Sequence, residues 1–240
     1  MKYFVTADIH GFYDEFKTAL DKSGFDFNNS EHKIVICGDV FDRGSQPKEL
    51  IDFILTNKEK IIYIRGNHED LMEYMIDRNY SDYSDVKNGT AETIVKLCPE
   101  WQISEFDLKK IAIKTRLQEV LDLSINYYET DKYVFVHGWI PIDEDNNQYD
   151  SNWRNAERYR WEISRWTSPV EMYKREIYEP NKIIVCGHHY CSMLWREHCP
   201  ERFSEFGENA NFEPFITDKM IALDACTAYT HKVNIVVLED

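Results

Sequence analysis

The sequence has no long apolar run. No stretch of its 240 residues approaches the roughly 20 apolar residues that a helix needs to cross a bilayer. The first residues lead straight into a strand-like segment and do not resemble a secretory signal. We therefore expect a cytoplasmic protein with no membrane partner. Hydrophobic residues make up 43% of the chain and aromatic residues 14%, which predicts a packed globular fold.

Positive charge is scarce. The chain has 28 Lys and Arg residues against 43 Asp and Glu residues, so its formal net charge is −15. A surface of this sign repels nucleic-acid phosphates, which argues against duplex nucleic acid as a partner. The same acidity suits a protein that gathers carboxylates around cations, although most acidic side chains are expected on solvated helix faces.

Paired cysteine motifs are also absent. None of the six cysteines forms a CxxC pair, and Cys37, Cys186 and Cys226 lie in or beside apolar runs. In a cytosolic protein this pattern predicts buried, reduced thiols. Internal repeats, low-complexity tracts and linkers are lacking too, so we expect residues 1–240 to form a single domain.

Short apolar segments rich in Val and Ile predict buried strands covered by helices. Helix-like segments at 12–22 and 47–57 separate the first three of them, which predicts an α/β fold. The last two segments, on either side of 227–231, are expected to form a hairpin and to make part of the sheet system antiparallel. The predicted strands are 3–7, 33–38, 60–65, 133–136, 182–187, 220–223 and 233–238.

Two stretches depart from this alternation. Residues 71–130 show helical periodicity with many charges, so we expect a mostly helical insert between strands. Residues 152–178 are rich in Trp, Tyr and Arg, and their sequence leaves helix and loop both open.

Polar clusters follow five of the predicted strands. Alone, each cluster is explained by a turn or a helix cap. Together they point elsewhere, because the carboxyl ends of strands in an open α/β sheet face one crevice. Asp, Asn and His are ligands of divalent metal ions. The clusters are DIHG at 8–11, GDVFDRG at 38–44, RGNHE at 65–69, HGW at 137–139 and GHH at 187–189.

In this order the clusters resemble the calcineurin-like metallophosphoesterase superfamily, in particular its phosphoprotein phosphatase (Ser/Thr phosphatase) type with bacterial and phage relatives. That family reads DxHG, GDxxDRG, GNHE, HG and GH, and every motif is present between Asp8 and His188. The resemblance implies a layered α/β sandwich of two mixed β-sheets flanked by helices, here with the helical insert at 71–130. It also implies two divalent metal ions, Mn²⁺ first, with Fe or Zn²⁺ as alternatives.

The resemblance assigns the metal ligands residue by residue. Two adjacent ions would share a water, lower its pKa and hold two phosphate oxygens for in-line attack. The implied ligands are Asp8 and His10 for the first ion, Asp39 for both ions, and Asn67, His137 and His188 for the second ion.

Catalytic and phosphate-binding residues are implied in the same way. His68 resembles the general acid that protonates the leaving alkoxide, and Asp42 resembles the carboxylate that orients this imidazole. Arg43 and Arg65 resemble phosphate clamps, since a planar fork of donors suits two phosphate oxygens.

A third clamp is usual between the HG and GH motifs. Arg165 is our candidate, and Arg154 and Arg160 compete with it. The chain also departs from the family, which often has HGG and GHT at the last two motifs. Trp139 and His189 stand there instead, so we expect both near the crevice, with His189 a hydrogen-bond donor behind the ligands.

Three functions stay open. The first is hydrolysis of phosphomonoesters by direct attack of a metal-bridging hydroxide, as in Ser/Thr phosphoprotein phosphatases. The second is symmetrical hydrolysis of dinucleoside tetraphosphates such as diadenosine tetraphosphate. This reaction uses the same motifs, and the enzymes differ in the segments that cover the crevice. The acidic surface argues mildly against acidic phosphoprotein segments and leaves small substrates open. The third is a non-catalytic interaction module, against which the intact ligand positions argue. The expected partner is a phosphorylated substrate, either a phosphoprotein or a small phosphate ester or nucleotide.

Overall fold

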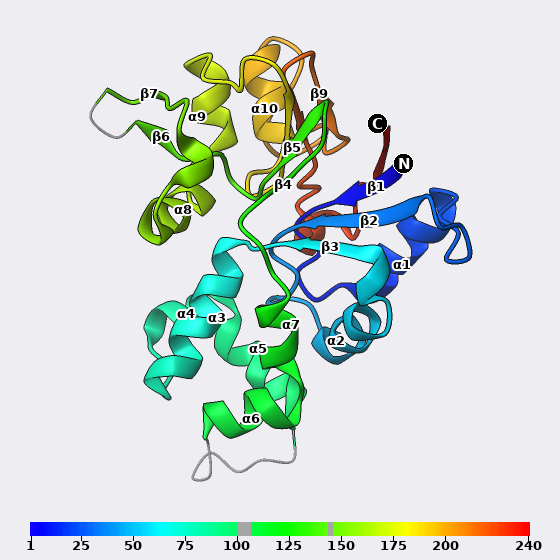
Figure 1. The fold of residues 1–240 in the computed structure, drawn as a ribbon, viewed down its shortest axis with the longest axis vertical. Helices are drawn as coiled ribbons and strands as arrows, with labels where there is room; N and C mark the ends of the chain where they lie inside the picture. Colours follow the sequence, from blue (N-terminus) through cyan, green and yellow to red (C-terminus); the bar gives the residue numbers. More distant parts are fainter. Residues whose placement is uncertain (100–106, 144–145) are drawn as a thin grey trace.

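Two β-sheets form the centre of the protein (Figure 1). This computed structural model describes residues 1–99, 107–143 and 146–240. The strands are β1 (Lys2–Thr6), β2 (His32–Cys37), β3 (Ile61–Ile64) and β11 (Val236–Glu239) in the first sheet, β4 (Tyr128–Glu129), β5 (Tyr133–Phe135), β8 (Ile183–Cys186), β9 (Phe215–Ile216) and β10 (Met220–Ala222) in the second, and the separate pair β6 (Ile142–Asp143) and β7 (Gln148–Tyr149).

Both large sheets are mixed. In the first sheet, ordered β11-β1-β2-β3, only β11 is antiparallel to its neighbour. In the second, ordered β4-β5-β8-β10-β9, the three inner strands are parallel and the two edge strands are antiparallel. The expected α/β class with mixed sheets is therefore confirmed. Because the inner strands are parallel, their carboxyl ends meet at one edge.

Helices cover the outer faces of the two sheets (Figure 1). The helices are α1 (Tyr13–Lys22), α2 (Pro47–Thr56), α3 (Asn67–Arg78), α4 (Tyr83–Asn88), α5 (Thr90–Leu97), α6 (Leu108–Lys114), α7 (Leu117–Asp122), α8 (Arg158–Arg165), α9 (Pro169–Lys174), α10 (Cys191–His198) and α11 (Thr227–Thr230), with 3₁₀ turns at Lys58–Lys60 and Trp153–Asn155. None of the helices in the described part of the chain has the length and apolar character that a membrane span requires.

Three apolar clusters hold these layers together. The cluster between the sheets joins Val5 and Val35 of the first sheet to Val185 and Ile221 of the second. A second cluster packs α1, α2 and the insert helices on the first sheet, and a third packs α8, α9 and α10 on the second. Burial of this apolar surface is the main force that fixes the two sheets against each other.

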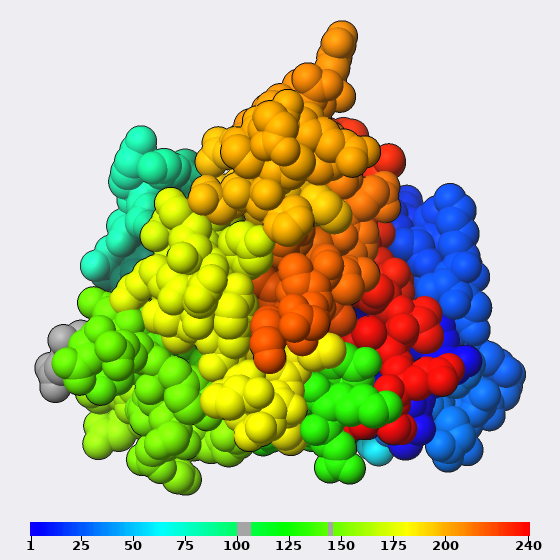
Figure 2. Space-filling view, turned by 90° about the horizontal axis from the view of Figure 1, so that it is seen from above, coloured from blue at the N-terminus to red at the C-terminus, as the bar shows by residue number. Residues whose placement is uncertain are grey.

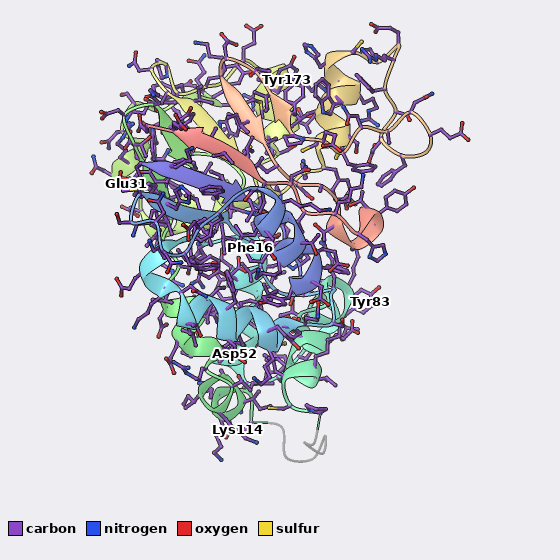
Figure 3. All side chains as sticks on the ribbon, turned by 90° about the vertical axis from the view of Figure 1, so that its right-hand side faces the viewer. Phe16, Glu31, Asp52, Tyr83, Lys114 and Tyr173 are labelled. Carbon is purple, nitrogen blue, oxygen red and sulfur yellow. The ribbon has the colours of Figure 1, made fainter. Side chains whose placement is uncertain are left out.

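The helical insert was predicted correctly in character but not in its bounds. Its first helix, α3, begins at Asn67, inside the third polar motif, and its last described helix ends at Asp122. The residues that suggested helical periodicity, such as Ile111 and Val120, are buried. Figure 3 shows Lys114 of this insert at the end of the molecule opposite Tyr173. Part of the predicted segment, 100–106, lies outside the described residues.

The predicted hairpin at the end of the chain is wrong. β10 and β11 belong to different sheets, and α11 lies between them. β11 instead pairs antiparallel with β1, with Leu238 opposite Tyr3, and both side chains enter the cluster between the sheets. This long-range burial decides the pairing. The expectation that some strands are antiparallel is nevertheless confirmed.

The cysteines agree with the prediction that the thiols are buried. Five of the six are buried, and Cys199 is half-buried. Cys199 directly follows α10. The segment after this helix, orange in Figure 2, projects from the molecule in the view from above.

At the edge of the second sheet, Glu129 of β4 forms ion pairs with Arg154 and Lys182. Its carboxylate accepts a hydrogen bond from Arg154 Nε at 2.9 Å and lies 2.8 Å from Lys182 Nζ. The hydrogen bonds from Arg154, the largest influence, lower the pKa of Glu129 from 4.5 to about 2. Because the folded pKa is depressed, this stabilisation is complete above pH 4.5 and is lost as the pH falls towards 2.

We expect Glu129→Gln to lower the free energy of unfolding by about 1–2 kcal/mol at neutral pH. The difference in the free energy of unfolding between Glu129→Gln and the unsubstituted chain should narrow as the pH falls from 4.5 towards 2, because Glu129 is then protonated and neither chain carries its negative charge. Urea denaturation at a series of pH values measures it. Glu119→Gln is the control, since the Glu119 pair with Arg116 is exposed. A deficit that does not change with pH would contradict the ionic account.

Candidate metal centre

The polar motifs at the strand ends converge as the parallel strands require. Asp39 follows β2, and its carboxylate belongs to two groups of ligand-type atoms that lie within 4.8 Å of one another. One group adds His10 and His68, and the other adds His137 and His188. Asp39 thus occupies the shared position that the resemblance assigned to a bridging ligand.

Asp8 takes a slightly different place from the expected one. It is in neither group among the residues that the structure describes. Its carboxylate accepts the backbone N–H of His188 at 3.1 Å and 3.0 Å, which brings it to the second group's side. The structure places His68 in the first group, where Asp8 was expected. The ligand role of Asp8 stays a prediction.

Backbone strain is concentrated at this centre. Asp8, His10, Asp39 and His188 all have positive φ, between 51° and 69°, although none is glycine. Asp42 and the residue after it share this conformation, with φ of 72° for Asp42. Left-handed backbone is unfavourable for such residues and persists where the surroundings enforce it, typically at functional sites.

Glu69, the last residue of the third motif, enforces part of that geometry. Its side chain is fully buried, and its Oε2 accepts the N–H of Gly66 at 2.7 Å and of Asp39 at 2.9 Å. Its Oε1 accepts the N–H of Val40 at 3.0 Å. One carboxylate therefore joins the loop after β2 to the loop after β3 and caps the start of α3.

Two glycines make room for the carboxylates. A Cβ at Gly66 would lie 2.2 Å from Asp39 Oδ1, and a Cβ at Gly187 would lie 2.1 Å from Asp8 Oδ2. These distances are shorter than any real contact of this kind, so only glycine allows such close approach.

His137 gives the strongest indication of a cation. Its Nδ1 donates to the carbonyl of Cys37 at 2.8 Å, so Nε2 is the ring nitrogen left for a metal. That Nε2 lies 2.7 Å from Asn67 Oδ1 and 3.3 Å from Asp39 Oδ1. An imidazole nitrogen, an amide oxygen and a carboxylate oxygen, each of a type that binds divalent metals, thus face one another in a buried place. The residues present fit a metal site.

His10 is prepared in the same way. Its Nδ1 donates to the carbonyl of Phe41 at 3.0 Å, so Nε2 presents its lone pair to the centre. Arg43 donates to this Nε2 at 2.8 Å and approaches His68 Nε2 at 3.3 Å. The Arg43 guanidinium therefore points into the first group, where it can meet an anionic ligand.

The pKa directions match a centre built for cations. Burial, and then the charge of Arg43, hold the pKa of His10 well below its usual value, and burial with neighbouring His137 lowers the pKa of His188 to about 3. Burial and the nearby carboxylates of Asp224 and Asp39 raise the pKa of Asp8. Imidazoles that stay neutral and carboxylates crowded together both favour metal binding.

His68 and Asp42 form the expected pair. His68 Nδ1 donates to Asp42 Oδ2 at 2.7 Å, and both side chains are buried. Burial alone would lower the pKa of His68, but the charge of Asp39 and the hydrogen bond to Asp42 outweigh it and raise the pKa. Asp42 is itself held by two hydroxyl groups, because Thr90 donates to Oδ2 and Thr93 donates to Oδ1, each at 2.8 Å.

Arg65 and Arg165 meet on one buried carboxylate, that of Asp70. Arg65 Nε donates to Asp70 Oδ1 at 2.7 Å, and Arg165 Nε donates to Oδ2 at 2.6 Å. The remaining guanidinium nitrogens are engaged too, with Glu73 as a partner of Arg65 and Asn126 as a partner of Arg165. The structure brings these two predicted clamps together, but through Asp70.

The competing arginines lie in other networks. Arg154 bonds Glu129 and covers the ring of Trp153 at 4.2 Å, and Arg160 bonds Asp150 at 2.7 Å. Arg165 is therefore the candidate of the three that shares a partner with Arg65.

The two positions where the chain departs from the family pattern behave differently. Trp139 follows the fourth motif, but its large ring is buried in the apolar cluster of the second sheet, where it gains from packing. His189 stacks on His188 with ring centroids 4.6 Å apart and bonds Ser168 Oγ at 2.7 Å. This position behind the proposed ligand agrees with its expected place.

Sequence reasoning missed several residues of the centre. Thr90 and Thr93 come from the helical insert, where nothing in their local sequence distinguishes them from ordinary helix residues. Asp70 directly follows the third motif, and this adjacency was a usable signal. Asp224 lies outside the five polar motifs, yet it is buried near Asp8, and burial raises its pKa to about 7.

Comparison with known proteins identifies relatives of this chain. A bis(5'-nucleosyl)-tetraphosphatase PrpE [asymmetrical] of Anoxybacillus flavithermus is 28% identical over 201 residues, which are 78% of this chain and 78% of that protein. The protein of the same name from Halalkalibacterium halodurans is 28% identical over 155 residues, 60% of this chain. That alignment spans only 59% of the relative's own length.

Solved structures agree at the level of the fold. A protein provisionally assigned as a diadenosine tetraphosphatase matches 99% of this chain and 89% of its own, with a TM-score of 0.55 and 14% identity. A Saccharomyces cerevisiae protein serine/threonine phosphatase matches 100% of this chain and 80% of its own, with a TM-score of 0.54 and 13% identity.

The family model described as calcineurin-like phosphoesterase matches residues 1–218, most of the chain and every polar motif. The predicted resemblance is thereby confirmed. The chain belongs to the calcineurin-like phosphoesterase family.

Proposed function

We propose that this chain hydrolyses dinucleoside tetraphosphates at a centre of two Mn²⁺ ions. The observation that carries the proposal is the convergence of both ligand groups on Asp39, beside the His68–Asp42 pair. The substrate class is supported by relatives named for dinucleoside tetraphosphate hydrolysis, which align over up to 78% of this chain. These names favour the substrate class of our second expectation over a phosphoprotein, for which the support is similarity of fold. Because both relatives are named as asymmetrical hydrolases, the proposal does not include the symmetrical cleavage that we expected.

The residues that would hold the ions are those around Asp39. Bound divalent ions activate a water and neutralise charge on the phosphate oxygens. The proposed ligands are Asp8, His10, Asp39, Asn67, His137 and His188.

The chain's own residues supply the proton and part of the phosphate binding. His68 donates a proton from Nε2 to the leaving oxygen, since its Nδ1 is fixed on Asp42 and Nε2 faces the centre. Thr90 and Thr93 keep Asp42 in place. Arg43, whose guanidinium already points into the first group, binds phosphate oxygens.

Metal binding is tested directly by calorimetric titration with Mn²⁺. We expect about two ions per chain, and we expect Asp39→Asn to lose both sites because it removes the charge that the two ions share. Asp52→Asn is the control, because Asp52 is exposed and pairs with Lys48 at the surface. Two sites of unchanged affinity in Asp39→Asn would contradict the proposed arrangement.

Catalysis is tested with diadenosine tetraphosphate in the presence of Mn²⁺. We expect His68→Asn to lower kcat by roughly 10²–10⁴-fold, the usual contribution of a general acid, while the exposed His198→Asn leaves kcat unchanged. A phosphoserine peptide measured under the same conditions compares the two substrate classes. Faster turnover of the peptide would reject the tetraphosphate assignment, and equal rates for His68→Asn and wild type would reject the proton donor.

The Arg65–Asp70–Arg165 network is tested by Asp70→Asn. Losing the buried charge leaves two guanidinium groups without their common partner, so we expect a loss of about 3 kcal/mol in the free energy of unfolding and a higher KM. Urea denaturation and initial rates measure these effects. Asp77→Asn, exposed on the same helix, is the control. Unchanged stability would show that the network contributes little.

A further inference from the structure

Trp166 is an exposed indole beside the proposed metal centre. Its ring lies against that of His188, with centroids 6.1 Å apart and planes at 87°. About half of Trp166, 51%, is exposed, whereas Trp153 and Trp161 of the same aromatic stretch are 0% and 2% exposed. A large apolar ring gains from burial, so an indole exposed at the edge of a site is suited to cover a ligand.

The backbone around Trp166 is fixed to the same motif that positions His137. Trp139 N–H donates to the carbonyl of Ser164 at 3.0 Å. Gly138, which follows His137, lies so close to this turn that a Cβ there would be 2.5 Å from Ser164 O and 2.6 Å from the carbonyl oxygen of Arg165. The indole is therefore held in a set position relative to the centre, which limits the entropy lost when a ligand stacks on it.

The preceding residue strengthens this attachment. Arg165 is buried and donates twice to Asp70 of α3, through Nε at 2.6 Å and Nη2 at 3.1 Å. On the following side, Ser168 caps α9 and bonds His189, which stacks on His188. Both chain directions from Trp166 thus lead to anchored residues, Arg165 on α3 and Ser168 beside His189.

We propose that Trp166 stacks on the nucleobase of a nucleotide whose phosphates occupy the centre around Asp39. This assignment rests on the proposed function, which places nucleoside phosphates there. Every nucleobase has a flat π-face, and stacking on an aromatic side chain tolerates any base. Trp166 is in this account a specificity residue that binds the nucleoside part and takes no part in proton transfer.

Binding of non-hydrolysable analogues tests the proposal without requiring turnover. The probes are α,β-methylene-ADP and methylenediphosphonate, which share the phosphonate group and differ by the nucleoside. In the presence of Mn²⁺ we expect the unsubstituted chain to bind the nucleotide analogue about tenfold more tightly. Trp166→Ala should abolish this preference, and Trp166→Phe should restore most of it, because a phenyl ring also stacks. Calorimetry measures the affinity of each chain for each probe.

Tyr159→Ala is the matched control. Tyr159 lies in α8, which ends at Arg165 directly before Trp166, and it is 50% exposed. It is seven residues before Trp166, roughly 10 Å away along the helix axis. We expect this variant to keep the full preference for the nucleotide analogue.

Each remaining outcome has a defined meaning. If the unsubstituted chain shows no preference for the nucleotide analogue, or if Trp166→Ala keeps it, the stacking role is wrong. Turnover of diadenosine tetraphosphate is measured separately. If diadenosine tetraphosphate is hydrolysed with a KM that does not depend on Trp166, the inference is overturned and the proposed function stays intact. A preference that depends on Trp166 without any turnover supports the inference and rejects the proposed function.

Discussion

The arrangement of this protein depends on one electrostatic constraint, the crowding of acceptor atoms around buried Asp39. His137 Nε2 and Asn67 Oδ1 face its carboxylate. Asp8 also lies close by: its pKa is raised by burial and then by the charges of Asp224 and Asp39. In a medium of low polarity such a set is unfavourable without positive charge. Burial holds the pKa values of His10 and His188 below their usual range, so these two imidazoles do not supply that charge. A bound cation is the natural completion of this set.

Holding these groups together requires features that would otherwise be disfavoured. Left-handed backbone at Asp8 and Asp39, glycines packed directly against carboxylates, and fully buried Glu69 all serve the same placement. Each is compensated locally: Glu69 receives three backbone N–H groups, and Thr227 Oγ1 donates to the carbonyl of Asp8 at 2.9 Å. The rigid cluster between the two sheets anchors the strands from which these loops start. Stability of the core and geometry of the centre are thus linked through the strand ends.

Much of this could be predicted from the sequence because the determinants are local. A buried strand followed by a polar motif fixes which side chains face the sheet edge, and this placed Asp39 and His188 in one centre. Features set by distant segments could not be predicted. The partner of β11 depends on burial of Leu238 against Tyr3, and the support of Asp42 comes from Thr90 on an insert helix. Trp139 illustrates the same limit, since only the packed second core reveals that this motif residue is buried.

The separation between chemistry and selectivity follows from these observations. Under the proposed function, the residues that meet at Asp39 act on a phosphate group, which is common to every substrate considered. Discrimination between substrates must then come from groups placed beyond the phosphate, on segments that cover the centre. In this chain the helical insert supports the His68–Asp42 pair through Thr90, whereas the turn after α8 presents an exposed indole next to His188. Since that turn is anchored on Gly138 and Asp70, selectivity is built on the same rigid frame as the chemistry.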